Sequence, residues 1–243
     1  MVKLAAYAFM SYCALRSVAL FKKPEMVYEM FPSIDFSTKA NADASIVALA
    51  TARALADLIL ASGMLAFGGL TGRFASLAVI FPMFFVNHII DGIAHPPIVP
   101  VVVTNVVVLL LNFYEAAAGG SLGKYSYALM QGGFGLLFLT EPADLVQDPF
   151  TFAKEGTVAL MVGQKLGFAV GMILCMHAAM TLLKPPTGCI AAMAIVLAGM
   201  AKMAFVDSMP VPNPSLIAAG VCMVLCLSDA LFLGGGGEKT KMK

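Results

Sequence analysis

The sequence predicts an all-α, polytopic membrane protein with about eight transmembrane helices. Of its 243 residues, 60% are hydrophobic and only 12% are charged, whereas about a quarter of the residues of a soluble domain are charged. Apolar runs of about 20 residues, which is the length that crosses a bilayer as a helix, recur along the whole chain. Barrel strands need only about ten residues, so these longer continuous runs predict helices rather than a closed barrel.

The apolar runs divide the chain into regularly spaced candidate helices. They comprise residues 4–21, 44–67, 74–93, 98–118, 122–140, 157–183, 190–209 and 216–233. The first run resembles a cleaved signal peptide in its leading Lys3, but its counterpart in the second half of the chain favours retention. Between the first two runs, Met26, Met30 and Phe31 lie on one side of a short amphipathic segment, which predicts a connector at the membrane surface.

Two stretches of the chain align with each other and indicate an internal repeat. The stretch TGRFASLAVIFPMFFVNHIIDGIAHPP begins at Thr71, and TGCIAAMAIVLAGMAKMAFVDSMPVPN begins at Thr187. Both open with Thr-Gly, and both end on an aspartate, Asp91 or Asp207, that a proline follows five residues later. The upstream runs keep roughly the same register, so each half of the chain reads as four helices.

The repeat predicts two units, residues 1–119 and residues 120–243, the second ending in the flexible cationic tail GGGGEKTKMK. An even number of spans in each unit makes the repeats parallel and brings both termini to one side of the membrane. Lysine and arginine gather on the side of the termini, at positions 3, 73, 124, 184, 239, 241 and 243. The positive-inside rule therefore predicts that the termini face the cytosol, or the equivalent matrix or stroma.

Ionisable side chains within the apolar runs are candidates for function, because charges at membrane depth cost several kcal/mol. Arg53 and Asp57 lie one turn apart on one predicted helix, and Lys165 lies near the aligned position in the second half. We expect Arg53 to pair with Asp91, and Lys165 to pair with Asp207. An aspartate ends the corresponding helix in both halves. This recurrence favours a structural role for the pairs, and the alternative is that they bind a proton, an ion or a ligand.

A second group of candidates surrounds His88. Asn87 lies four residues before Asp91, and His88 lies one turn from it, so the carboxylate could fix the tautomer of the imidazole. His88 is therefore a candidate proton relay, metal ligand or pigment ligand, and its alternative role is a hydrogen bond to a neighbouring helix. His177, a lone polar residue in an apolar run, is a second candidate cofactor ligand.

The remaining polar residues and the cysteines do not indicate a binding site. Glu115 and Asp229 lie near the terminal-side ends of their helices, where we expect them to be solvated at the level of the lipid headgroups. Cys222 and Cys226 share one helix face, but a metal site needs further ligands and a polar surrounding shell, so no metal site is predicted. The five cysteines all lie in or beside apolar runs and indicate no disulfide framework.

The pattern of each half resembles the DoxX-like group of small four-helix membrane proteins. In that pattern the first span ends before a proline, an amphipathic connector follows, the second span carries an arginine, and the third closes on Asp-Gly before a proline. The matching residues are Pro24, Arg53, Asp91, Gly92 and Pro96, with Pro142, Asp207 and Pro212 in the second half. The second half departs from the pattern at Ser208 and Gln164. The resemblance implies a four-helix architecture and says little about activity.

Reaction motifs are missing from the sequence, which carries no GxSxG, no phosphate-binding loop and no CxxC. A non-catalytic role is therefore favoured over catalysis, and the net charge of +1 provides no basic surface for nucleic acid. The first hypothesis is a non-catalytic accessory or structural subunit of a larger bioenergetic or photosynthetic membrane complex, with other integral membrane subunits as partners and lipid, chlorophyll or carotenoid as candidate ligands.

The alternative hypothesis is a small proton-coupled transporter or ligand-binding membrane protein. It would use the intramembrane polar groups Arg53, Asp57, Asn87, Asp91, Lys165 and Asp207. A third hypothesis, a membrane enzyme acting on lipids, would depend on His88.

Overall fold

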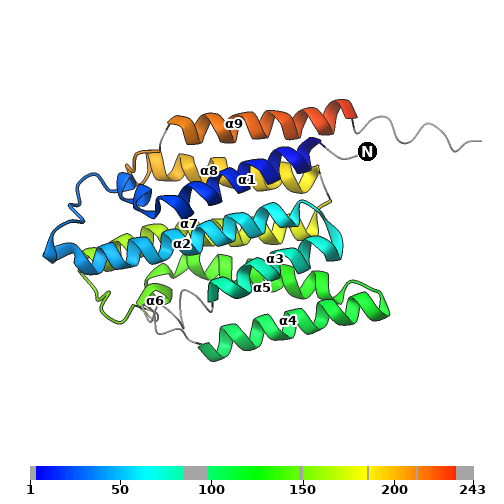
Figure 1. Ribbon diagram of the computed structural model, residues 1–243, viewed down its shortest axis with the longest axis horizontal. Helices are drawn as coiled ribbons and strands as arrows, with labels where there is room; N and C mark the ends of the chain where they lie inside the picture. Colours follow the sequence, from blue (N-terminus) through cyan, green and yellow to red (C-terminus); the bar gives the residue numbers. More distant parts are fainter. Residues whose placement is uncertain (1–3, 85–97, 148–149, 185, 212, 234–243) are drawn as a thin grey trace, which may run out of the picture.

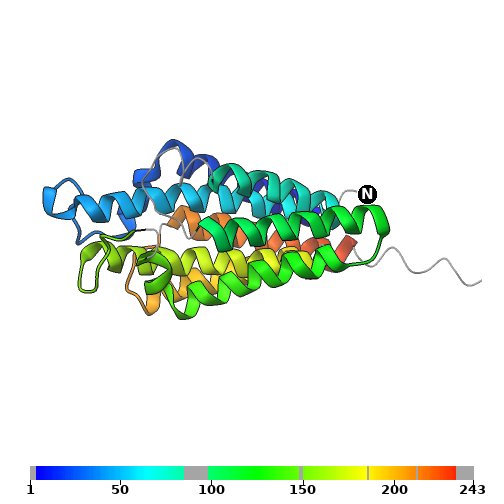
Figure 2. The same ribbon diagram turned by 90° about the horizontal axis from the view of Figure 1, so that it is seen from below.

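The computed structural model describes residues 4–84, 98–147, 150–184, 186–211 and 213–233, and within these ranges all the regular elements are helical. The long helices run roughly along one axis as an elongated bundle (Figures 1 and 2). They are α1 (Leu4–Lys22), α2 (Ala42–Leu65), α3 (Gly69–Phe84), α4 (Ile98–Ala118), α5 (Leu122–Thr140), α7 (Val158–Leu182), α8 (Thr187–Phe205) and α9 (Asn213–Ser228). The prediction of an all-α chain is confirmed for the described residues, and each of the predicted apolar runs overlaps one of these helices.

Within the described residues, five helical segments are long and apolar enough to cross a membrane. They are Leu4–Lys22, Lys39–Leu65, Val158–Leu182, Thr187–Phe205 and Asn213–Leu231. The described apolar parts of α3 and α4, Gly69–Phe81 and Val103–Ala118, are shorter. These segments indicate a multi-pass membrane protein, while a count of eight crossings stays a prediction.

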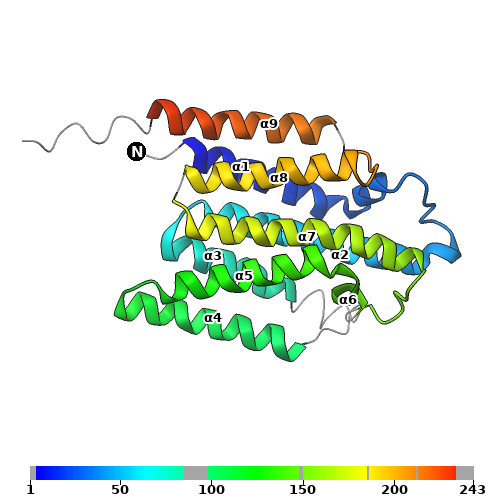
Figure 3. The same ribbon diagram turned by 180° about the vertical axis from the view of Figure 1, so that it is seen from behind.

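Helices α2 and α7 form the centre of the bundle and pack against each other. Helix α2 also contacts α1 and α3, and α7 also contacts α5 and α8. Helices α9 and α4 lie at opposite edges (Figures 1 and 3), where α9 contacts α1 and α8, and α4 contacts α5 and α3. The buried core between them includes Phe9, Leu77, Tyr127, Leu166 and Met193.

Glycines permit a close contact between α5 and α7. A Cβ atom added at Gly135 would lie 2.7 Å from Cys175 Sγ and 3.0 Å from the carbonyl oxygen of Gly171. A Cβ atom at Gly171 would lie 2.9 Å from the carbonyl oxygen of Gly135. The two backbones therefore touch, which is the arrangement that small residues permit between membrane helices.

Short helices join the long ones at the end of the bundle away from the termini. The connector η1 (Pro24–Met30) packs against α1 and α2 and is followed by η2 (Lys39–Asn41), and α6 (Pro142–Gln147) packs against α7. Val27 and Phe31 are buried under η1, whereas Met26 is exposed. The amphipathic connector thus buries part of its apolar side against the protein itself.

Both described ends of the chain lie at the same end of the bundle. The backbone N–H of Ala5, in the first turn of α1, donates a 3.0 Å hydrogen bond to Oδ2 of Asp229, in the final turn η4 (Asp229–Leu233). Figure 1 shows the first turn of α1 beside the last turns of the chain. We call this the terminal end of the bundle.

Candidate functional site

A buried ion pair ties α3 to α4 at the terminal end. The guanidinium of Arg73 donates through Nη2 to Oε1 of Glu115 at 2.5 Å and through Nε to Oδ1 of Asn112 at 2.6 Å. The side chains of Arg73 and Glu115 are only 4% and 10% exposed. Because a buried charge is costly unless it is paired and hydrogen-bonded, each of these groups depends on the other.

The same network holds the start of α5. The second carboxylate oxygen of Glu115 accepts a 2.8 Å hydrogen bond from the backbone N–H of Lys124, which lies in the first turn of α5. The first N–H groups of a helix have no partner within the helix, so a carboxylate placed there both satisfies one and opposes the positive end of the helix dipole. Gly123 permits the approach, because a Cβ atom there would lie 2.7 Å from Cα of Asn112.

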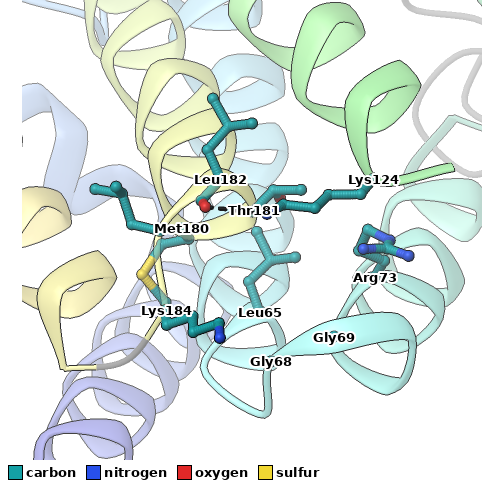
Figure 4. Close-up of a pocket in the computed structure, with 10 residues that line it drawn as sticks. Leu65, Gly68, Gly69, Arg73, Lys124, Met180, Thr181, Leu182 and Lys184 are labelled. Carbon is teal, nitrogen blue, oxygen red and sulfur yellow. Dashed lines mark hydrogen bonds between the residues drawn. The ribbon is translucent and has the colours of Figure 1, made fainter. Parts of the chain in front are cut away.

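A pocket of about 530 Å³, including space open to solvent, lies beside this network (Figure 4). Its walls come from the turn between α2 and α3, the start of α5 and the end of α7. Gly68 and Gly69 form that turn with φ angles of 74° and 57°, a left-handed conformation that glycine adopts without strain. The lining residues are Leu65, Gly68, Gly69, Arg73, Lys124, Met180, Thr181, Leu182, Leu183 and Lys184. We call this the basic pocket.

Three cationic side chains line the basic pocket, and one of them is neutralised. Arg73 carries its ion pair with Glu115, whereas Lys124 and Lys184 form no ion pair with the described residues. Lys124 Nζ donates a 3.2 Å hydrogen bond to the carbonyl oxygen of Leu182, an acceptor at the C-terminal end of α7 (Figure 4). The described residues of the pocket lining therefore carry two net positive charges beside apolar walls.

His177, a predicted cofactor ligand, lies in the contact between α7 and α2 with no exposed surface. Its Nε2 lies 3.0 Å from the carbonyl oxygen of Leu58 and 2.7 Å from Oγ of Ser62, which itself donates to Leu58. Because a carbonyl only accepts, Nε2 carries the proton and Nδ1 is left as an acceptor. That Nδ1 atom has no described hydrogen-bond partner. In this arrangement the imidazole joins the two central helices.

The structure brings some of the predicted ligand or proton residues together at the other end of the bundle. Lys165 Nζ donates to the backbone carbonyl of Asp207 at 3.4 Å, while the Asp207 carboxylate pairs with Lys202 at 2.7 Å. Lys202 also lies 3.9 Å from the ring centroid of Phe168, a cation–π contact. The expected ion pair between Lys165 of α7 and Asp207 is absent, because Lys202 of α8, five residues before Asp207, takes the carboxylate and leaves Lys165 only the carbonyl.

Two further predicted residues lie along α2. The side chain of Arg53 is exposed, and that of Asp57 is partly buried one turn later. Asp57 makes no hydrogen bond or ion pair to any residue within the described ranges. The remaining candidates, Asn87, His88 and Asp91, lie outside the described residues, as do Gly92, Pro96 and Pro212 of the family-like pattern.

The expectation that Glu115 and Asp229 are solvated is wrong. Glu115 lies in the network with Arg73, and Asp229 is 4% exposed with its carboxylate on the N-terminal turn of α1. Both carboxylates are drawn into the bundle because a neighbouring helix begins beside them and offers an unpaired N–H group.

Sequence reasoning did not identify the residues of the basic pocket or of the network beside it. A signal for the network was present, because Asn112 and Glu115 are three residues apart and therefore share one face of an otherwise apolar helix. Arg73 and Lys124 were counted only as charges that orient the chain. Their partners come from helices far apart in sequence, so spacing alone could not pair them.

Four cysteines from three helices gather in the other half of the terminal end. Cys13 of α1, Cys189 of α8, and Cys222 and Cys226 of α9 are all buried, and the Cys226 thiol donates a hydrogen bond to the backbone carbonyl of Ala5. In the part of the chain that the structure describes, no group of three or more histidine, cysteine or acidic side chains is arranged to hold a metal ion.

Comparison of the chain with protein-family models, with curated proteins and with solved structures finds no match in any of the three. The function must therefore be argued from the residues and their arrangement.

Proposed function

We propose that this chain is a non-catalytic accessory subunit of a larger membrane complex, built from two parallel four-helix repeats and seated beside other integral membrane proteins. The main support for the proposal is that polar side chains of the bundle join helices to each other. Arg73 with Glu115, Ser62 with His177, and Ser76 with Tyr127 at 2.7 Å each join one helix to another. Polar groups used in this way hold a scaffold together, which favours a structural role.

The packing of the helices supports the repeat. If α1 to α4 correspond to α5, α7, α8 and α9, then the contact of α1 with α2 corresponds to that of α5 with α7, and the contact of α4 with α5 corresponds to that of α9 with α1. Helices α2 and α7 exchange places under this correspondence, so the central contact between them maps onto itself. This is the pattern of a two-fold axis that runs along the helices, as parallel repeats require.

The polar caps support the same correspondence. Glu115, near the end of α4, accepts from the N–H of Lys124 at the start of α5, and Asp229, after α9, accepts from the N–H of Ala5 at the start of α1. Three residues before each acid, a second side chain contacts the same helix start, since Asn112 donates to the Gly123 carbonyl and Cys226 donates to the Ala5 carbonyl. The first helix of each proposed repeat thus begins in contact with the last helix of the other repeat.

The edge helices offer surfaces for partners. Helix α4 exposes Val103, Leu110 and Phe113 at 53%, 60% and 56%, and α9 exposes Ile217 and Val224 at 66% and 61%. Lipid or another membrane protein can cover such faces. With the terminal end in the cytosol, the matrix or the stroma, both faces would lie across the bilayer, where helices of other subunits could pack.

The size of the protein in mild detergent tests this proposal. We expect the chain, purified under its native promoter with a small affinity tag, to elute as a heteromeric particle far heavier than its 25.5 kDa, with lipid or pigment bound. Light scattering gives the mass, and an absorption spectrum reports pigment. A photoreactive side chain at Leu110 or Val224 should crosslink to the same co-purifying subunit, and the same probe at the buried Leu77 should not. A monomer or homodimer would contradict the proposal.

Asp57 favours a second candidate function, a small proton-coupled transporter. Its carboxylate lies within an apolar spanning segment and has no hydrogen-bond partner among the described residues, and such groups mark proton pathways in membrane proteins. For this function we expect Asp57→Asn to reduce proton uptake into dye-loaded proteoliposomes at least tenfold. Asp43→Asn, in the first turn of the same helix, is the matched control and should retain uptake. Equal uptake by wild type and Asp57→Asn would exclude this role for Asp57.

A further inference from the structure

The charges of the basic pocket suit an anion. Lys124 and Lys184 enter it from α5 and from the end of α7, and the first turn of α3 begins at its edge, at Gly69 (Figure 4). The N–H groups of a first helical turn carry partial positive charge and face outward along the axis. Since Glu115 already neutralises Arg73, the two lysines are left without an acidic partner among the residues that the structure describes.

The apolar side chains around the pocket point to an interface between water and lipid. Leu182 and Leu183, on its rim, are 44% and 39% exposed, and Phe67, beside the turn of α2 and α3, is 56% exposed. Tyr125, 61% exposed, lies next to Lys124, whose Nζ is 5.8 Å from the tyrosine ring centroid. Tyrosine and lysine at helix ends are typical of the headgroup level of a bilayer.

We propose that the basic pocket binds a phosphate group, with Lys124 and Lys184 as its charged contacts. Basic pockets between membrane helices on the positive side are sites for anionic phospholipid headgroups. An acyl chain attached to that phosphate would lie along Leu182 and Leu183, and free phosphate is the other source of the same group. The inference rests on the membrane placement in the proposed function and is independent of partner subunits.

The test measures phosphate binding by the full-length purified protein. In one arm, the protein in detergent is titrated with phosphatidylglycerol or phosphatidylcholine, and bound lipid is counted by native mass spectrometry. In the other arm, inorganic phosphate is titrated and followed by calorimetry. We expect one phosphatidylglycerol per chain to bind, and Lys124→Gln/Lys184→Gln to weaken that binding at least tenfold. The arm in which lysine-dependent binding occurs identifies lipid or free phosphate as the source.

Matched variants separate the site from the general charge of the protein. Lys22→Gln/Lys23→Gln removes the same charge from exposed lysines at the opposite end of the bundle and should bind as the wild type does. Lys124→Arg/Lys184→Arg keeps the charge and should retain binding, which controls for folding together with an unchanged elution volume. The proposal is overturned if the glutamine variant, eluting as the wild type, binds both probes as tightly as the wild type. A purely monomeric protein would contradict the accessory role and leave this test intact.

Discussion

Replacing Arg73 with leucine is expected to lower the free energy of unfolding by about 3–5 kcal/mol, because it leaves the Glu115 carboxylate buried without its counter-charge. The guanidinium also satisfies Asn112, so the variant loses both of its hydrogen bonds to α4. Since Glu115 holds the first turn of α5 as well, the contact between α4 and α5 should loosen with it.

The midpoint of unfolding in a series of detergent mixtures of rising sodium dodecyl sulfate measures this effect. The matched control is Lys202→Leu, which breaks the ion pair with Asp207 at the other end of the bundle. In that pair the lysine side chain is 38% exposed and the carboxylate side chain 22%. Both side chains are more exposed than those of Arg73 and Glu115, so the control should cost about 1 kcal/mol or less.

A second substitution decides whether the cost comes from the unpaired charge. Glu115→Gln in the Arg73→Leu background removes that charge and should recover at least half of the lost stability. A double variant as unstable as Arg73→Leu alone would contradict the explanation, as would an Arg73→Leu protein that unfolds with the wild type.

The fold was predictable from the sequence at the level of its helices, for a physical reason. Backbone groups in lipid must bond within their own segment, so each apolar run has to be a helix, as at 98–118 and 122–140, which match α4 and α5. Helix boundaries were less predictable where composition is uniform. Residue 74 was the predicted start of the third helix, but α3 begins at Gly69, since the left-handed Gly68 and Gly69 turn the chain earlier.

The network and the basic pocket were not predictable, because their residues become neighbours only through packing. Lys124 and Leu182 are 58 residues apart in the chain, and Arg73 and Glu115 are 42 apart. The hydropathy pattern places Glu115 near a helix end, where a carboxylate is usually solvated. The pattern does not show that another helix begins beside Glu115. The i,i+4 spacing of Arg53 and Asp57 was visible in the sequence because it is local, but the structure shows no ion pair between them.

Replacing Gly135 with leucine is expected to have the largest effect on packing, about 3 kcal/mol or more of lost stability. The first added carbon alone would lie 2.9 Å from the backbone nitrogen of Cys175 and 3.0 Å from the carbonyl oxygen of Gly171. Backbone atoms of a helix cannot rotate away, so α5 must move off α7 along their whole contact. Sodium dodecyl sulfate unfolding, as used for Arg73, measures the loss.

Gly133→Leu provides the matched control, because it adds the same side chain to the same helix two residues away, where a new Cβ atom meets nothing within 4 Å. The two variants share their change in helix propensity and in hydropathy, since both replace a glycine inside α5 with leucine. Any difference between them therefore measures the contact with α7. If Gly135→Leu unfolds at the same detergent composition as Gly133→Leu, the two helices do not touch through their backbones. The contact between α5 and α7 would then not depend on the glycine at position 135.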